Sequence, residues 1–311
     1  MNFVHEPVLL REVLQWLNPQ PGGVYCDGTL GGGGHSEAIL LQCGGDAALY
    51  GIDRDGAAIA AASERLKAYG GFRPIRGNFH DGKALLREAG AGPLDGVLLD
   101  LGVSSPQLDT PERGFSYHED APLDMRMDQG GGMTAAEFLN TADERELAAV
   151  IRDYGEEKWA ARIARIICEH RAEKPMETTF DLVKAVDAAI PKAVRRKEDG
   201  HPARRTFQAV RIAVNDELAP LEQALKDFMD CLAPGGRLCV ITFHSLEDRI
   251  VKQTFRAMEH PCVCPPKAPI CTCGRKPTAR VLGGGAIAPS AEELERNPRS
   301  RSAKLRVAEK L

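Results

Sequence analysis

The sequence contains no run of about 18 apolar residues, and its first residues form neither a basic segment nor an apolar core. These are the features of a membrane-spanning helix and of a secretory signal, so we expect neither in this chain. The nine cysteines are an odd number, and Cys43, Cys231 and Cys239 lie within apolar runs, which is typical of reduced, buried thiols. The sequence therefore predicts a cytoplasmic protein with no membrane partner.

Two common nucleotide-binding motifs are also absent. The glycines at 31–34 are not spaced as G-x-G-x-x-G, and no G-x-x-x-x-G-K-[ST] occurs. The first absence disfavours a dinucleotide site, and the second excludes a P-loop. With 311 residues, the chain is long enough for one large domain with an insertion, or for two domains.

The most informative segment is DGTLGGGGHS at 27–36, which follows the apolar pair Val24 and Tyr25 and precedes a helical pattern at 37–42. This order predicts a strand, a glycine turn and a helix. Glycine lets a backbone approach a ligand closely, and the first turn of a helix offers free N–H groups. A tight turn without a ligand is the alternative, but four consecutive glycines cost conformational entropy that a simple turn does not require. We therefore expect a small polar ligand here.

Two acids near this loop narrow the choice of ligand. Asp53 follows the apolar segment 47–52, about 20 residues after the glycines, where an acid accepts hydrogen bonds from ribose hydroxyls. Asp27 opens the loop and would repel a pyrophosphate, but it suits a ligand that carries a sulfonium and an ammonium group. S-adenosylmethionine fits this charge pattern better than NAD or ATP.

Further apolar segments at 72–75 and 94–101 alternate with helical patterns, which predicts an α/β fold with a parallel sheet. The glycine loop, Asp53, Phe79 and Asp100 follow or end such segments, so we expect them at the carboxyl edge of the sheet, where ligands bind. Phe79 would stack on an adenine ring, or else it is a core aromatic residue at the end of its strand.

The pattern becomes helical after Thr134, with segments at 135–139, 143–153, 157–171 and 179–190. Thr134 and Asp143 have the residue types of helix N-caps. We expect a helical domain at 109–203, inserted between the fourth and fifth strands, so that the main domain consists of 1–108 and 204–311. The second part of the main domain should contain one long helix at 206–232, the fifth strand at 237–243 and a terminal strand at 303–307.

The basic residues are concentrated in two segments, although the net charge of −4 argues against a general nucleic-acid-binding protein. Segment 192–211 has seven basic and two acidic residues, and segment 275–311 has nine and four, so each has a local charge of +5. Two such segments on an acidic protein indicate contacts with a polyanion. Solvated surface charge is the alternative for either segment alone.

Four cysteines form two C-x-C pairs flanked by prolines, at Cys262, Cys264, Cys271 and Cys273. Two cysteine pairs in a short loop can form a tetrahedral thiolate zinc site, although C-x-x-C is the more usual spacing. Reduced surface thiols or a reversible disulfide are the alternatives.

The chain resembles the bacterial small-subunit ribosomal RNA cytosine-N4 methyltransferase family, which depends on S-adenosylmethionine. The matching segments cover nearly the full length, at 5–10, 27–36, 100–107, 113–115, 122–128, 154–156, 201–209, 243–249 and 297–303. The resemblance implies a Rossmann-like class I methyltransferase sheet with an inserted all-helical domain. It implies a target cytidine in the decoding region of 16S rRNA, in the small ribosomal subunit. It also implies cofactor contacts at Gly33, Gly34, His35, Asp53, Phe79, Asp100 and Gln107.

Methylation of a cytosine amine places demands on the residues near Asp100. The amine is a poor nucleophile, so the enzyme must hold it in line with the sulfonium methyl group, and hydrogen-bond acceptors beside it would help. Asp100, Ser104 and Ser105 are the candidate catalytic residues, with cofactor binding and loop capping as their alternative roles. This loop contains no cysteine, whereas methylation of the ring carbon C5 requires a cysteine nucleophile. His244, after the fifth strand, either contacts the substrate or caps the following helix.

The basic residues complete the prediction for an RNA substrate. Arg204, Arg205, Arg299 and Arg301 would bind phosphates around an unpaired or extruded base. Two other classes of function stay open, namely methylation of a protein or small molecule, and RNA binding in ribosome assembly without turnover. A homodimer, through the insert or the C-terminal segment, also stays open.

Overall fold

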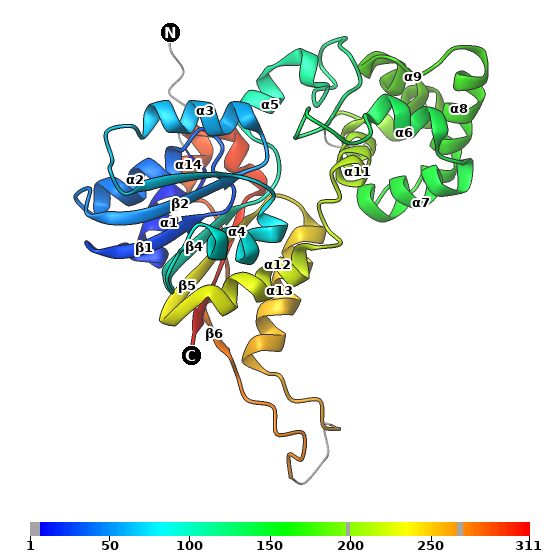
Figure 1. The fold of residues 1–311 in the computed structure, drawn as a ribbon. Coiled ribbons are helices and arrows are strands. Elements are labelled where there is room, and N and C mark those ends of the chain that lie inside the picture. The colour runs from blue at the N-terminus through cyan, green and yellow to red at the C-terminus, as the bar shows by residue number, and fades with distance from the viewer. Residues whose placement is uncertain (1–6, 197–199, 266–269) are drawn as a thin grey trace. The chain divides into compact units, whose positions relative to one another are not determined.

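The computed structural model describes residues 7–196, 200–265 and 270–311. The chain divides into two compact units (Figure 1). Unit 1 consists of Met1–Gly102 and Pro220–Leu311, and unit 2 is Val103–Ala219. Unit 2 contains the whole of the expected insert, 109–203, with additional residues at both ends. Within the described ranges, no helix has both the length and the apolar character needed to cross a bilayer.

A seven-stranded sheet forms the centre of unit 1, with the strand order β3-β2-β1-β4-β5-β7-β6. The first five strands pair in parallel, whereas β7 is antiparallel to both β5 and β6. The Rossmann-like class I methyltransferase sheet is thus confirmed, but the expectation that every strand is parallel is wrong. The strands are β1 (Gly23–Asp27), β2 (Ala47–Asp53), β3 (Phe72–Arg76), β4 (Leu94–Asp100), β5 (Leu232–Thr242), β6 (Ala279–Ile287) and β7 (Lys304–Lys310).

Helices cover both faces of this sheet (Figure 1). Side chains alternate along each strand, so Tyr25 and Leu98 pack against one helical layer while Cys26 and Leu99 pack against the other. The first layer contains α1 (Leu10–Leu17), α2 (Gly34–Gln42) and α3 (Gly56–Arg65). The second contains α4 (Gly82–Glu88), α12 (Leu221–Cys231) and α13 (Ser245–Glu259). Three short elements complete the unit, η1 (Phe79–Asp81), α14 (Ala291–Arg296) and η3 (Pro298–Ser302).

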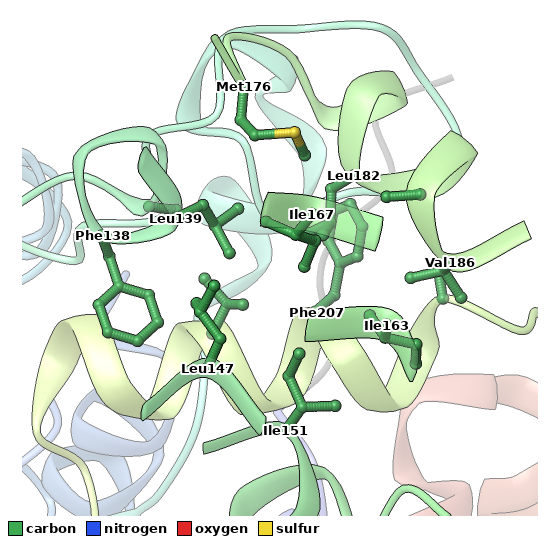
Figure 2. Close-up of a cluster of buried hydrophobic side chains, with 14 of the residues drawn as sticks. Phe138, Leu139, Leu147, Ile151, Ile163, Ile167, Met176, Leu182, Val186 and Phe207 are labelled. Carbon is green, nitrogen blue, oxygen red and sulfur yellow. The ribbon is translucent and has the colours of Figure 1, made fainter. Parts of the chain in front are cut away.

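Unit 2 is helical and has its own core (Figure 2). Apolar side chains of successive helices meet there, including Leu147, Ile163 and Phe207, all of which are buried. The helices are α5 (Ser105–Asp109), η2 (Pro111–Arg113), α6 (Ala135–Thr141), α7 (Glu144–Gly155), α8 (Ala160–Glu173), α9 (Thr179–Ala189), α10 (Lys192–Arg195) and α11 (Arg204–Asn215). Thr134 and Asp143 cap α6 and α7 by accepting backbone N–H hydrogen bonds at 3.1 and 2.8 Å, as the sequence predicted.

The single helix expected at 206–232 is wrong, because the chain forms α11 and α12 with a break between them. Asp216 adopts a left-handed conformation, with φ of 48°, and ends α11. Pro220 then precedes α12, and proline lacks the N–H that a continuous helix would require. The apolar pattern continues across this break, which explains the wrong prediction.

Candidate functional site

The loop between β1 and α2 is built on glycines with different constraints. Gly31 and Gly33 have φ values of +49° and +75°, which side-chain-bearing residues rarely adopt. A Cβ atom on Gly34 would lie 2.7 Å from the ring of Pro7, which is too close. A Cβ atom on Gly32 would have no neighbour within 4 Å. Positions 31, 33 and 34 therefore require glycine, while position 32 leaves open space beside the backbone.

Asp27 ends β1 and is almost completely buried. Its Oδ2 accepts a hydrogen bond from the hydroxyl of Ser36 at 2.7 Å, and its Oδ1 accepts one from the N–H of Thr29 at 3.2 Å. Burial raises the pKa of Asp27 to about 6, although these hydrogen bonds act in the opposite direction. Asp27 thus ties the end of β1 to the first turn of α2, and a cation nearby would favour its ionised form.

Asp53 ends β2 and holds two backbone segments. Its Oδ2 accepts a hydrogen bond from the N–H of Gly31 at 2.8 Å, and its Oδ1 accepts one from the N–H of Asp55 at 2.8 Å. Burial raises the pKa of Asp53, with these two hydrogen bonds opposing the effect. Each carboxylate oxygen has a second lone pair, so Asp53 can also accept hydrogen bonds from ribose hydroxyls.

Asp100 ends β4, beside the glycine loop. Its backbone N–H donates to the hydroxyl oxygen of Thr29 at 2.6 Å, and its Oδ2 lies 3.8 Å from Nδ1 of His35. Its Oδ1 is buried and has no hydrogen-bond partner among the described residues, yet the whole side chain keeps 26% of its exposure. Burial, and then the carboxyl groups of Asp27 and Glu247, raise the pKa of Asp100 well above its usual value. Asp100 therefore has a buried acceptor without a hydrogen-bond partner among the described residues, on a side chain that is partly exposed as a whole.

His35 lies in the first turn of α2 and is buried. Its Nε2 forms a hydrogen bond with the carbonyl oxygen of Val8 at 2.9 Å, so the ring is held from the side opposite Asp100. The matching segment 5–10 begins at residues that lie outside the described ranges. From Pro7 onward, this segment packs against the start of α2.

The end of β5 adds a carboxyl group that the sequence analysis missed. Glu247, in the first turn of α13, is buried, and its Oε2 accepts hydrogen bonds from the N–H groups of Phe243 and His244 at 2.9 and 3.3 Å. His244 is the N-cap of α13, which confirms one of its two sequence interpretations. An acid three residues after a helix N-cap was the signal that could have identified Glu247.

Phe79 begins η1 and is partly buried against the core under α4, α12 and α13. Its Cβ lies 3.5 Å from the position of a Cβ on Gly28, so it is next to the glycine loop. The core interpretation of Phe79 is thus correct in part, and its stacking on an adenine ring stays a prediction.

The carboxyl edge of the sheet therefore brings together six of the seven residues predicted to contact the cofactor, namely Gly33, Gly34, His35, Asp53, Phe79 and Asp100. Four carboxyl groups follow one another along this edge and disfavour a phosphate, because like charges repel. They belong to Asp53, Asp27, Asp100 and Glu247. The residues fit a ligand with a ribose and a positive charge, and the unsatisfied Oδ1 of Asp100 indicates that a donor is expected there.

Three predicted residues belong to unit 2 rather than unit 1. Ser104 is the N-cap of α5, and its N–H donates to Oε1 of Gln107 at 3.0 Å. Gln107 is buried. Ser105 is the first residue of α5. The loop-capping interpretation of Ser104 is consistent with this geometry, and the catalytic and cofactor roles of these three residues stay predictions.

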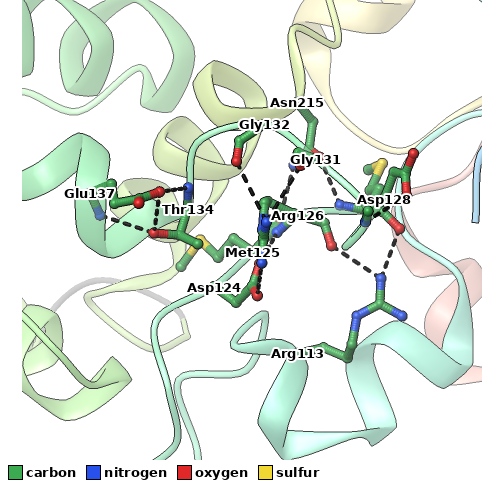
Figure 3. Close-up of polar contacts among 12 residues, drawn as sticks. Arg113, Asp124, Met125, Arg126, Asp128, Gly131, Gly132, Thr134, Glu137 and Asn215 are labelled. Carbon is green, nitrogen blue, oxygen red and sulfur yellow. Dashed lines mark hydrogen bonds and ion pairs between the residues drawn. The ribbon is translucent and has the colours of Figure 1, made fainter.

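The matching segments 113–115 and 122–128 fold together within unit 2 (Figure 3). Arg126 forms a paired interaction with Asp124, with Nε to Oδ1 and Nη2 to Oδ2 both at 2.8 Å. Arg113 donates to the carbonyl oxygen of Met127 at 2.8 Å. Oδ1 of Asn215 accepts a hydrogen bond from the N–H of Met127 at 2.8 Å, and its Nδ2 donates one to the carbonyl oxygen of Met125. These polar contacts order a segment that lacks any helical or strand pattern.

The four predicted phosphate-binding arginines have different surroundings. Arg204 is exposed at the start of α11, whereas Arg205 lies 3.7 Å from the buried carboxylate of Glu157. Arg299 and Arg301 are exposed on η3, on either side of Ser300, which is buried. Arg205 therefore has a structural role, and the other three arginines present their charge at the surface.

The four predicted metal ligands also come together. The sulfur atoms of Cys262, Cys264, Cys271 and Cys273 all lie within 4.8 Å of one another.

Comparison with known proteins gives close matches over the whole chain. Residues 2–311 match the MraW methylase family. The chain is 54% identical to "Ribosomal RNA small subunit methyltransferase H" of Heliobacterium modesticaldum, over 100% of both chains. It is 54% identical to the protein of the same name from Trichlorobacter lovleyi, over 99% of both. A solved rRNA methylase from Streptococcus thermophilus covers 97% of this chain and 92% of its own, at 12% identity and a TM-score of 0.40, which is too low to add to the argument.

Proposed function

This chain belongs to the MraW methylase family, and from that premise we propose that it methylates small-subunit rRNA with S-adenosylmethionine as the donor. We further propose that the target is N4 of a cytidine in the decoding region of 16S rRNA, as the sequence resemblance implies. The observation that carries the proposal is the buried Oδ1 of Asp100, which has no partner among the described residues and lies at the carboxyl edge of the sheet.

The cofactor would lie across the ends of β2, β1 and β4. In this arrangement, Asp53 accepts hydrogen bonds from the ribose, and the glycine loop with Gly33 and Gly34 follows the rest of the ligand at close range. Phe79 covers the adenine ring. When bound, S-adenosylmethionine supplies a methyl group on a cationic sulfur, and the carboxyl groups of Asp27 and Asp100 provide the negative charge that favours such a cation.

Asp100 has a second role in the proposed chemistry. An ionised carboxylate accepts a hydrogen bond from the cytosine amine, which orients the nitrogen lone pair and holds the amine in line for attack. His35, 3.8 Å from Oδ2 of Asp100, helps to fix the orientation of this carboxylate. After transfer, the amine has become acidic and can release its proton to water, so no dedicated base is required.

The proposal also assigns roles to three residues of unit 2. Ser104 and Ser105, close after β4 in the chain, are assigned as further acceptors for the amine, and Gln107 as a cofactor contact. These roles rest on the resemblance and on the position of α5 directly after β4 in the sequence.

The RNA would be bound through phosphates. Arg299 and Arg301, exposed on η3, and Arg204, exposed on α11, are suited to this role. Arg205 is assigned with them, although its contact with Glu157 gives it a structural role too. The target base must be unpaired or extruded, since a base inside a duplex cannot present its amine to a buried methyl group. An rRNA substrate is consistent with the expected location in the cytoplasm. The proposed reaction requires one chain, and it is also compatible with a homodimer.

Mass spectrometric mapping of nucleosides tests this proposal. Undermethylated small ribosomal subunits are incubated with the protein and isotope-labelled S-adenosylmethionine, and the rRNA is then digested. We expect the label on N4 of one cytidine, and its loss with Asp100→Ala. The matched control is Asp95→Asn, which changes an acid near the other end of β4 that accepts a hydrogen bond from the N–H of Val24.

The other outcomes discriminate the alternative functions. Label in ribosomal protein, in a small molecule or on a ring carbon would reject the cytosine-N4 assignment. Binding of the rRNA with no incorporation of label, under conditions where the donor is bound, would favour an assembly factor without turnover.

A further inference from the structure

The segment 260–278 connects α13 to β6 (Figure 1), and we call it the cysteine segment. The sulfur atoms of its four cysteines form a compact group. The distance from Cys271 Sγ is 3.6 Å to Cys262, 3.9 Å to Cys264 and 3.5 Å to Cys273. The sulfurs of Cys262 and Cys273 lie 3.8 Å apart. No two of the four are farther apart than 4.8 Å.

These distances match one particular arrangement of sulfur atoms. Zinc binds thiolates at about 2.3 Å in a tetrahedron, and the edge of that tetrahedron is about 3.8 Å. A disulfide bond would place two sulfurs at about 2.0 Å, far closer than any pair here. A [4Fe–4S] cluster, with four irons between its ligands, needs sulfurs farther apart than this group has. The geometry therefore fits four ligands around one ion.

The described residues of the cysteine segment, 260–265 and 270–278, form no hydrophobic core that could hold this arrangement. None of its described residues is buried, and its large apolar side chains face solvent, with Val263 62% and Ile270 74% exposed. A short segment that buries little apolar surface needs another source of stability, and a bound metal ion can supply it because the free energy of metal binding stabilises the fold.

The backbone around the sulfurs is also suited to thiolates. The N–H of Thr272 donates to Sγ of Cys264 at 3.4 Å, and the N–H groups of Val263 and Arg275 are directed at Sγ of Cys273. Gly274 follows the second pair with a φ of +64°, which allows the chain to turn directly after its ligand. N–H donors to ligand sulfurs are a regular second layer of metal–thiolate sites.

We propose that Cys262, Cys264, Cys271 and Cys273 bind one zinc ion as a tetrathiolate site with a structural role. All four positions of the tetrahedron are filled by protein, so the ion has no open position for substrate or water. The site links the part of the cysteine segment that follows α13 to the part that leads into β6. This proposal does not depend on the identity of the methylated base.

The first test measures metal in the unmodified protein. The full chain is purified without a histidine tag or chelator, and its metals are counted by inductively coupled plasma mass spectrometry. We expect one zinc per chain, and replacement by cobalt should give the strong visible bands of a tetrahedral cobalt–thiolate site. Absence of bound metal, or bound iron in place of zinc, would overturn the proposal.

A thiol count separates the zinc site from the redox alternative. The protein, unfolded with a chelator and without reductant, should show all nine thiols. A count lower by two or four would indicate disulfides and refute the zinc site.

Variants then locate the ion. Cys271→Ser and Cys273→Ser should each lower the zinc content at least tenfold, whereas Cys168→Ser, which removes a thiol of α8, should retain it. Loss of zinc should also accelerate tryptic cleavage after Arg275, which is exposed. Equal zinc content in both serine variants and the control would place the ion elsewhere and reject these ligands. The zinc content of the unmodified chain still tests the proposal if a variant fails to fold.

Discussion

Oδ2 of Asp53 accepts a hydrogen bond from the backbone N–H of Gly31 at 2.8 Å. This single contact joins the end of β2 to the glycine loop that follows β1. The residue expected to bind the ribose thus also positions the backbone expected to surround the rest of the cofactor. A change at Asp53 should therefore affect both.

Asp53→Asn should weaken binding of S-adenosylmethionine about 10- to 100-fold, because a hydrogen bond to a charged acceptor contributes about 1.5–3 kcal/mol. Asp55→Asn is the matched control, since it makes the same change two residues away, where the side chain caps α3 and asparagine caps equally well. Isothermal titration calorimetry with the purified variants measures both affinities. Equal affinities would show that Asp53 does not hold the ribose.

Asp27→Asn should stabilise the protein at high pH. The pKa of Asp27 is raised from 3.8 to about 6, so ionisation at pH above 6 costs folding free energy. The cost is at most about 3 kcal/mol. This cost shrinks as the pH falls below 6 and vanishes below about 3.8, where the carboxyl group is protonated in both the folded and the unfolded state. Urea unfolding of both proteins at about pH 8 and about pH 4.5 measures the difference. A gain that is the same at both values would contradict the role of ionisation.

Gly33→Ala should destabilise unit 1 by about 1–3 kcal/mol, because alanine is strained at a φ of +75° and its Cβ would lie 3.2 Å from Ala62. Gly32→Ala is the control, since its φ is not positive and its Cβ would meet nothing within 4 Å. That change should leave stability unchanged or raise it slightly. Thermal unfolding without cofactor distinguishes the two variants. Equal melting temperatures would mean that the loop relaxes around the added methyl group.

The rate of methyl transfer should rise with pH through the pKa of Asp100 in the enzyme complex, because the carboxylate accepts a stronger hydrogen bond from the amine than the neutral carboxyl group does. Since burial raises the pKa of Asp100, this acidic limb should lie above the usual range of an aspartate. Single-turnover rates measured from about pH 4.5 to 9 provide the profile. In Asp100→Asn the rate should be lower and the limb absent. A limb that persists unchanged in this variant would belong to another group.

The double change Arg299→Glu with Arg301→Glu should weaken RNA binding and reduce its salt dependence. Each lost phosphate contact lowers the slope of log affinity against log salt by about 0.7–0.9. The control is Lys67→Glu with Arg87→Glu. This double change alters the net charge by the same amount, at exposed positions far from η3 in the sequence. Filter binding at several salt concentrations, with cofactor affinity measured in parallel, tests this. RNA affinity as high as that of the control would remove η3 from the interface.

Most strands of the sheet could be predicted from the sequence, and the clearest were those with a largely apolar pattern. β2 and β4 were recognisable because most of their residues are apolar and buried or partly buried, and each strand ends in an aspartate. β6 was missed because it contains Gly283, Gly284 and Gly285 and is partly exposed. The reversal of β7 was also missed, since an apolar segment does not reveal the direction in which its strand will pair.

The candidate site was predictable in its residue types but not in its contacts. Asp27 and Asp53 were found because they follow strands, yet the bonds from Asp27 to Ser36 and from Asp53 to Gly31 depend on how the loop closes. Glu247 was missed because its place three residues after the N-cap His244 predicts a capping contact, whereas its burial beside Asp100 depends on how α13 packs.

The position of β7 between β5 and β6 has a consequence for biosynthesis. Every residue in the core of unit 2 comes from one continuous stretch of chain, so this unit can fold while later residues are still being translated. The sheet of unit 1 cannot close until Lys304–Lys310 has left the ribosomal tunnel, since that strand occupies an interior place. During this interval the nascent chain has a folded unit 2 and a sheet in unit 1 whose edge is still unpaired, and this is when it most needs protection from aggregation.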